Sequence, residues 1–140
     1  MNRGYSLLET VLTMALASTL AAVAIPSISS WRARHITLRE AKRVQRALER
    51  AYIIALLRET TVEVSITATG LVATSQDGTP IFLLSVPPNT SIQLKSKEQQ
   101  SIHFYPSHTA TPTTIVVTQS AHQCSVVLSL RGRTRRECQW

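Results

Sequence analysis

A long apolar run near the N-terminus constrains this chain more than any other feature. Residues 5–25, YSLLETVLTMALASTLAAVAI, are apolar apart from Glu9 and a few serines and threonines. About 20 such residues span the hydrocarbon of a bilayer as a helix, so we expect a transmembrane segment over residues 5–26, after a short leader, residues 1–4 (MNRG). The alternatives are a plain membrane anchor and a buried helix of a soluble protein. The second is disfavoured because the run lacks a polar face.

Glu9 distinguishes this run from an ordinary anchor or secretory signal. A secretory signal has its small-residue cleavage site after the apolar stretch, whereas the obvious processing point here, Gly4, precedes it. Cleavage after Gly4 would leave the helix on the mature protein, with the new α-amine of Tyr5 one turn from Glu9. A carboxylate inside a bilayer is costly and needs a positive partner. This amine, or that of a neighbouring subunit, fits that role.

Residues 27–58 continue the helical pattern, which gives one predicted helix over residues 5–58. Small and apolar side chains recur there at helical intervals: Ala41, Val44, Leu48, Ala51 and Ala55. Pro26 is expected to bend the helix where it leaves the lipid, because its ring removes one backbone hydrogen bond. A basic cluster occupies the other faces: Arg32, Arg34, Arg39, Lys42 and Arg43. We interpret it as a solvated or head-group-facing surface, with a nucleic-acid site as the alternative.

Beyond residue 58 the apolar pattern changes to a period of two. Val62, Val64 and Ile66 alternate with polar residues, which is typical of a half-buried strand. Further strands are predicted at LVATS, PIFLLS, SIQLKS, SIHFY, TIVVTQ and QCSVVLSL, with a hairpin turn at Asp77-Gly78 and an exposed loop over residues 106–113. The fold class is therefore α+β: one long helix packed on a C-terminal antiparallel β-sheet domain, residues 59–140. Whether that domain holds one sheet or two stays open.

No catalytic constellation is recognisable in the sequence. The four histidines are scattered and lack carboxylate or cysteine neighbours at the spacing of a nucleophile: His35, His103, His108 and His122. A metal site built on His122, Cys124 and Cys138 is one possibility, but a cysteine pair in an exported protein more often forms a disulfide. We expect no enzymatic activity, no cofactor and no metal.

The segment LRGRTRRECQW carries the densest charge of a chain in which lysine and arginine outnumber acidic residues 15 to 8. A three-residue turn over residues 130–132 would place Gly132 at the left-handed position that such turns need. In that register Cys124 lies opposite Cys138, so we predict a disulfide between them. Closing a loop of this length stabilises the folded chain by roughly 3 kcal/mol.

The same register predicts where the arginines lie. Arg133 and Arg135 fall on the face away from the cysteines, beside Arg131 in the turn, whereas Arg136 falls on the cysteine face near the sheet edge. Residues two apart in a strand are about 6.6 Å apart, so the guanidiniums of Arg133 and Arg135 can each bind a separate phosphate. Two lysines are candidates to enlarge this patch: Lys95 and Lys97. The alternative is a frayed, merely solubilising end of the chain.

The N-terminal residues resemble a known family. Gly4-Tyr5-Ser6-Leu7-Leu8-Glu9 is similar to the leader and processing site of type IV pilins and type II secretion pseudopilins. The resemblance implies that a prepilin peptidase cleaves after Gly4 and methylates the amine of Tyr5, and that Glu9 helps the subunit dock into a filament. Pro26 falls where the family has a helix-bending proline. Tyr5 departs from the family, in which phenylalanine is usual.

The chain as a whole most resembles the GspH/FimT group of minor pilins and pseudopilins, whose soluble part is β-rich. The element Gly132-Arg133-Thr134-Arg135 is similar to the DNA-contacting element of FimT-like minor pilins in natural transformation. The resemblance implies a minor type IV pilin that binds extracellular duplex DNA with little sequence preference and strong salt dependence. The residues expected to contact DNA are Arg131, Gly132, Arg133, Arg135 and Arg136.

Two rival functions remain open: a structural pseudopilin of a type II secretion system, and a minor pilin that primes assembly without binding DNA. The implied partners are other pilin or pseudopilin subunits, prepilin peptidase, the inner membrane and DNA. The implied location is the bacterial inner membrane, crossed once, with the globular domain in the periplasm and the subunit incorporated in a pilus or pseudopilus at the cell surface.

Overall fold

The computed structural model describes residues 6–67, 69–96 and 101–139, without the side chains of residues 23–27. The leader residues 1–4, the cleavage-site residue Tyr5 and the candidate Lys97 lie outside the described residues.

The described chain forms one helix and nine strands, and the predicted α+β fold class is confirmed. The elements are α1 (Leu7–Arg58), β1 (Val62–Thr67), β2 (Gly70–Ser75), β3 (Pro80–Ser85), β4 (Thr90–Leu94), β5 (Ser101–Tyr105), β6 (Thr109–Ala110), β7 (Thr113–Gln119), β8 (His122–Leu128) and β9 (Thr134–Gln139). Each strand expected from the sequence is present. The two-residue strand β6 lies where a loop was expected.

The chain divides into two compact units, residues 1–32 and 33–140. The first holds the N-terminal part of α1, and its described apolar side chains are mostly exposed, Leu7 by 82%. Its hydroxyls donate to the helix's own carbonyls, for example Thr10 to Leu7 (2.8 Å) and Thr19 to Leu16 (2.8 Å). These hydroxyls of the apolar segment are thereby satisfied within the helix.

No helix in the described part of the chain is both long enough and apolar enough to cross a membrane, so the span predicted over residues 5–26 is not confirmed. Glu9 lies in the first turn of α1 and is exposed. The helix continues through Pro26. The bend expected at Pro26 stays a prediction.

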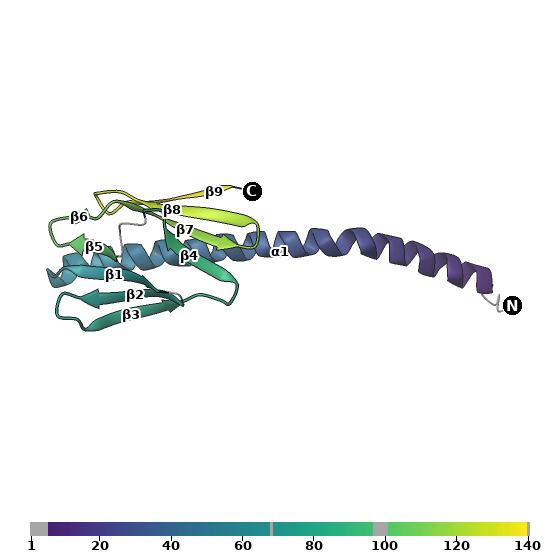
Figure 1. Ribbon diagram of the computed structural model, residues 1–140, viewed down its shortest axis with the longest axis horizontal. Coiled ribbons are helices and arrows are strands. Elements are labelled where there is room, and N and C mark those ends of the chain that lie inside the picture. Colours follow the sequence, from purple (N-terminus) through teal and green to yellow (C-terminus); the bar gives the residue numbers. More distant parts are fainter. Residues whose placement is uncertain (1–5, 68, 97–100, 140) are drawn as a thin grey trace. The chain divides into compact units, whose positions relative to one another are not determined.

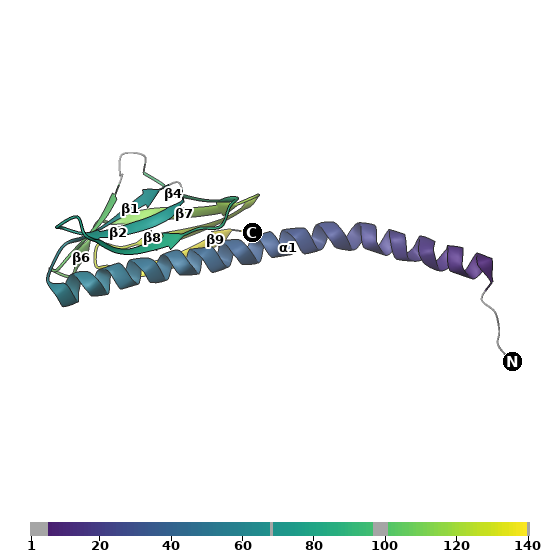
Figure 2. The same ribbon diagram turned by 90° about the horizontal axis from the view of Figure 1, so that it is seen from below.

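The second unit packs two antiparallel sheets on residues 33–58 of α1 (Figure 1). The five-stranded sheet has the order β3-β2-β1-β5-β6, and the four-stranded sheet has the order β4-β7-β8-β9. In Figure 2 both sheets lie on the same side of α1. The chain crosses between the sheets after β3, after β4 and after β6. The β-rich domain therefore contains two sheets, which the sequence left open.

The core lies between α1 and the inner faces of both sheets. The predicted helical stripe is fully buried, since Ala41, Val44, Leu48, Ala51 and Ala55 are each 0% exposed. The largest side chains opposite them are Phe104, Leu71, Ile102, Ile115 and Leu128. Small residues on the helix allow the strands to approach closely, while the branched and aromatic residues of the sheets fill the space.

The basic cluster on α1 is not wholly a solvated surface. Glu40, which is 0% exposed, accepts hydrogen bonds from Arg43 (2.7 Å) and Arg39 (3.3 Å). A buried carboxylate requires such partners because it has lost its water. Two of the five arginines and lysines of the predicted cluster therefore neutralise a buried charge, which the sequence analysis did not anticipate.

Candidate nucleic-acid interface

The β8–β9 hairpin has the predicted register. Cys124 pairs with Cys138 and Val127 with Arg135. The Gly132 N–H donates to the Ser129 carbonyl (3.0 Å), and the Ser129 N–H donates to the Arg133 carbonyl (2.9 Å). Gly132 has a φ of +74°, the left-handed conformation that this turn demands. We call residues 122–139, which comprise β8, the turn and β9, the arginine hairpin.

A disulfide joins Cys124 to Cys138, as predicted. Cys124 is fully buried on the inner face of β8, and Cys138 is half-buried on β9 opposite it. Because both sulfurs are bonded to each other, neither is available to the alternative metal site with His122. The described residues hold no group of three or more side chains suited to a metal ion.

The turn of the arginine hairpin rests directly on α1. A Cβ on Gly132 would lie 2.5 Å from the Tyr52 ring, closer than any side chain tolerates. The Tyr52 ring is itself held edge-on against Phe104, with ring centroids 6.4 Å apart. Glycine is therefore required at residue 132 both for its φ and for its contact with the helix. Only the first of these two reasons is predictable from the sequence.

Two hydrogen bonds, one to α1 and one to β6, complete the attachment of the hairpin. The Thr134 hydroxyl donates to Glu49 of α1 (2.6 Å), and Gln45 donates to the same carboxylate (2.8 Å). At the turn, the Ala110 N–H of β6 donates to the Leu130 carbonyl (2.7 Å). The tail is thus held by a disulfide, a glycine–tyrosine contact and side-chain and backbone hydrogen bonds. The alternative of a frayed tail is wrong for the described residues.

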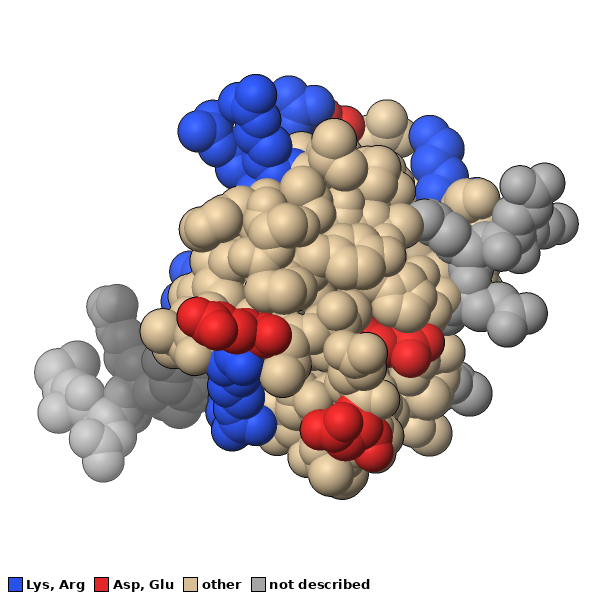
Figure 3. All heavy atoms as spheres, turned by 90° about the vertical axis from the view of Figure 1, so that its left-hand side faces the viewer, with Lys and Arg blue, Asp and Glu red and all other residues tan. Residues whose placement is uncertain are grey.

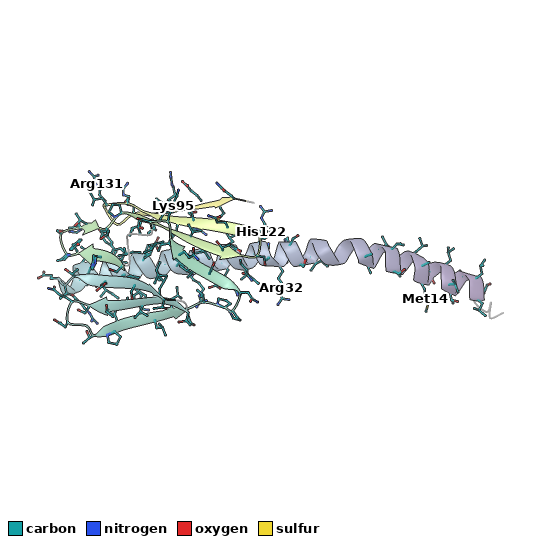
Figure 4. The ribbon with its side chains drawn as sticks, viewed as in Figure 1. Met14, Arg32, Lys95, His122 and Arg131 are labelled. Carbon is teal, nitrogen blue, oxygen red and sulfur yellow. A yellow bond between two sulfur atoms is a disulfide. The ribbon has the colours of Figure 1, made fainter. Side chains whose placement is uncertain are left out.

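The arginines alternate with the residues that attach the hairpin. Thr134 and Cys138 point to the side of α1, whereas Arg135 belongs to the opposite set of β9 residues and Arg133 directly precedes the strand, and both arginines are exposed. Arg131 lies at the turn and points away from the sheets (Figure 4).

Arg136 pairs with the buried Val126 but is exposed, because β9 is an edge strand of its sheet. The end-on view shows basic side chains gathered at one corner (Figure 3).

An acidic residue shares this face, which the sequence analysis missed. Glu137 lies two residues after Arg135 on the same side of β9 and forms an ion pair with it. Both side chains are exposed, Arg135 by 75% and Glu137 by 54%. Ion pairs exposed in this way are weak, so Arg135 can exchange its partner for another anion. The period-two pattern of β9 was the signal that could have placed Glu137 here.

A polar hollow of about 330 Å³ continues this face across the outer side of the four-stranded sheet. Its lining consists of Lys95, Thr114, Val116, Gln123, Ser125, Val127, Glu137 and Gln139. The backbone N–H of Lys95 donates to the Thr114 carbonyl (2.8 Å), which fixes the position of this residue beside β7. The structure therefore brings Lys95, which is 40 residues from Arg135 in sequence, onto the face that carries the arginine hairpin.

Solved structures with the same architecture identify the fold. The chain is similar to the type IV minor pilin FimU of Pseudomonas aeruginosa, with a TM-score of 0.63 and 16% identity, covering 74% of this chain and 90% of that one. A second crystal form of FimU gives a TM-score of 0.58. The minor pseudopilin EpsH of the Vibrio cholerae type 2 secretion system matches with a TM-score of 0.58 and 13% identity, covering 73% and 96% of the two chains. This chain has the fold of a minor pilin or minor pseudopilin.

No protein-family model and no curated protein matches the sequence, so the shared fold comes with little shared sequence. Within this minor-pilin fold the arginine hairpin forms one edge of the four-stranded sheet and rests on α1. Gly4 and Tyr5 lie outside the described residues, and Glu9 lies in the first turn of α1. The roles of these three residues in processing and docking remain predictions.

Proposed function

We propose that this chain is a minor type IV pilin that binds duplex DNA without sequence preference through the arginine hairpin, for uptake in natural transformation. One observation carries the proposal: the hairpin is fixed to α1 and to β6, and its arginines lie on the exposed side. Arg131, Arg133 and Arg135 are thus presented at set positions. Only side-chain freedom remains to be lost on binding, which makes the entropic cost smaller than for a disordered tail.

Phosphates are the chemistry that this surface fits. The guanidinium fork matches phosphate oxygens and keeps its charge at any relevant pH. Lys95 extends positive charge across the same face, and the polar lining of the hollow can bond to the sugar-phosphate backbone. If the hairpin contacts about three phosphates of the DNA backbone, a plot of the logarithm of the association constant against the logarithm of the salt concentration should have a slope of about −3.

We expect duplex to be bound at least as well as a single strand. Single-strand binding relies on aromatic side chains on which bases stack, and the described part of the hairpin, residues 122–139, contains no aromatic ring besides His122. Tyr105, on the other sheet, is stacked on His103 with ring centroids 6.2 Å apart. The exposed rings needed for base stacking are therefore lacking in this part of the chain.

The rest of the proposal concerns assembly. We infer that prepilin peptidase removes residues 1–4 by cutting after Gly4 and methylates Tyr5, and that Glu9 pairs with such an N-terminal amine in a filament. The support for this is the motif itself, the exposure of Glu9 and the apolar, outward-facing side chains of the first unit. Other pilin subunits and the inner membrane would cover these side chains, with the globular unit in the periplasm.

A structural pseudopilin of a type II secretion system is the second candidate. Two observations favour it: the likeness to EpsH, and the Arg135–Glu137 ion pair, which reduces the positive charge of the proposed interface. In that function the outer face would contact another pseudopilin. The rival predicts no measurable DNA binding.

The experiment titrates the full chain, purified in a non-ionic detergent, into a fluorescently labelled duplex at low and moderate salt. We expect Arg133→Ala/Arg135→Ala to weaken binding by about tenfold, since two phosphate contacts are lost. The matched control is Lys42→Ala/Arg58→Ala, which removes the same charge from exposed positions of α1. If both double variants bind like the unaltered chain, or weaken equally, the hairpin is not the DNA site and the pseudopilin function is favoured.

A further inference from the structure

A groove unrelated to the arginine hairpin lies between α1 and β3, on the other sheet. Its volume is about 220 Å³. Its lining consists of Arg43, Arg46, Ala47, Arg50, Phe82, Leu83 and Leu84. We call it the α1/β3 groove. It has a basic side, supplied by the helix, and an apolar side, supplied by the strand.

The positive charge of this groove is not balanced from within. Arg43 pairs with the buried Glu40 (2.7 Å). Arg46 and Arg50 form no ion pair among the described residues, and Arg50 lies over the Phe82 ring, 5.1 Å from its centroid. Such stacking fixes the guanidinium while leaving its edge N–H groups available for an acceptor. Arg50 is therefore held beside an apolar surface, and neither Arg46 nor Arg50 has an anionic partner in the part of the chain that the structure describes.

The strand side of the groove is an open sheet edge. β3 is the outermost strand of its sheet and pairs only with β2 in the described part of the chain. Its backbone groups on the far side are therefore not used by the sheet. Leu83, in the middle of β3, is 68% exposed. An exposed, apolar edge strand is a template on which another extended segment can pair.

We propose that the α1/β3 groove binds an extended acidic segment of a partner protein, which pairs with β3 as an added strand and places carboxylates against Arg46 and Arg50. Spacing supports this occupant. Helix residues four apart are separated by about 6 Å along the axis, and alternate residues of a strand by about 6.6 Å. β3 runs nearly along the direction of α1 (Figure 1), so carboxylates at alternate positions of the added strand meet the two arginines in turn.

The other side chains of that segment point to the opposite face of the sheet, away from α1. On that face they would lie beside the exposed Leu83, so the favoured sequence alternates acidic and branched apolar residues. Lipid head groups and DNA supply anions but no backbone N–H and C=O groups for a strand edge. The segment would pair with the five-stranded sheet, whereas the arginine hairpin belongs to the four-stranded sheet. This inference therefore goes beyond the proposed function.

The test uses the full chain in non-ionic detergent and a fluorescent peptide that alternates glutamate and valine, with a lysine–valine peptide as the control ligand. We expect the acidic peptide to bind and Arg46→Glu/Arg50→Glu to weaken it by at least about tenfold. Arg58→Glu/Arg131→Glu, with the same change of charge outside the groove and with neither residue one turn from Arg46 or Arg50, should leave binding within about twofold of the unaltered chain. Equal losses in the two variants would overturn the proposal.

A gain of binding excludes unfolding as the cause of that loss. Arg46→Glu/Arg50→Glu should acquire affinity for the lysine–valine peptide, which an unfolded variant cannot do selectively. Hydrogen exchange then tests the strand pairing: the acidic peptide should slow exchange of β3 amides and leave those of β9 unchanged. Binding without protection of β3 overturns the proposal. So does stronger competition from phosphatidylglycerol vesicles or duplex DNA than from unlabelled peptide, which would assign the groove to those ligands.

Discussion

Gly132 shows how one residue supports a charged surface without carrying charge. Its left-handed φ of +74° closes the turn, and the absence of a side chain allows the backbone to lie against Tyr52. The exposed neighbours Arg131 and Arg133 depend on both features, because the turn would lift from α1 if either were lost. For the proposed interface, Gly132 is therefore expected to matter as much as the arginines.

Gly132→Ala is therefore expected to destabilise the chain by about 3 kcal/mol. The left-handed conformation costs an alanine about 1–2 kcal/mol, and crowding against the ring adds a similar amount. Urea unfolding of the full chain measures the difference. In a Tyr52→Leu background only the conformational part should remain, so an unchanged cost there would contradict the proposed contact with the ring.

Glu137 is expected to limit DNA binding under the proposed function. It pairs with Arg135 and repels phosphate from the same face. Glu137→Gln should tighten duplex binding by about two- to fivefold, the range expected for one exposed charge interaction, as measured by fluorescence anisotropy. Glu59→Gln, an exposed acid that follows α1, is the control. Equal tightening by both variants would show that only net charge matters.

At the scale of elements, the arginine hairpin is held by covalent and non-covalent attachments that act at opposite ends. The disulfide fixes the open end of the hairpin, and Gly132 with Thr134 fixes the turn end on α1. The strand between them therefore cannot slip in register. A slip by one residue would move Arg133 and Arg135 to the side of the helix.

Loss of the disulfide is expected to lower the free energy of unfolding by about 3 kcal/mol. The Cys124→Ala/Cys138→Ala chain is compared with the oxidised chain by urea titration, and hydrogen exchange locates the change. Exchange should quicken in β9 and stay unchanged in β1, which belongs to the other sheet. A uniform acceleration in both strands would contradict a local role for the bridge.

The register of the hairpin was predictable because its signals are local: a glycine in the turn and two cysteines symmetrically placed about it. The contacts of the hairpin with Tyr52 and Glu49 were not predictable, since those residues are far away in sequence and no local pattern indicates their partners. β6 was missed for the same reason, because two residues become a strand only through their pairing with β5. The burial of Glu40 was not predicted, because in a helix segment rich in arginine a carboxylate is expected to be solvated.

At the scale of the whole molecule, the two sheets leave the chain with separate charged surfaces. The arginine hairpin belongs to the four-stranded sheet, and the α1/β3 groove lies at the edge of the five-stranded one. The α+β class and the helix stripe followed from periodicity. The division into two sheets did not, because the alternation of apolar residues is the same whichever sheet a strand joins.

Processing after Gly4 is a prediction for the full chain. Coexpression with a prepilin peptidase should give a mature mass that lacks residues 1–4 and carries one added methyl group, and Gly4→Val should retain the full mass because the cleavage site is lost. Mass spectrometry distinguishes the two products. Asn2→Val, within the same leader, should still be processed. Identical mature masses for Gly4→Val and the unaltered chain would refute the assigned cleavage site.

The hydrogen bond between Glu49 and Thr134 joins residues 85 positions apart. Contacts over such separations are costly to form early in folding, because a large loop must close before the contact stabilises anything. The Glu49 carboxylate and the side of the Tyr52 ring that faces Gly132 are covered only when this hairpin docks on α1, so we expect the arginine face to be among the last parts of the domain to assemble. A chain that displays its arginines in register has thereby joined α1 to its last strand, so a partner that recognised this face would select folded subunits over partly folded ones.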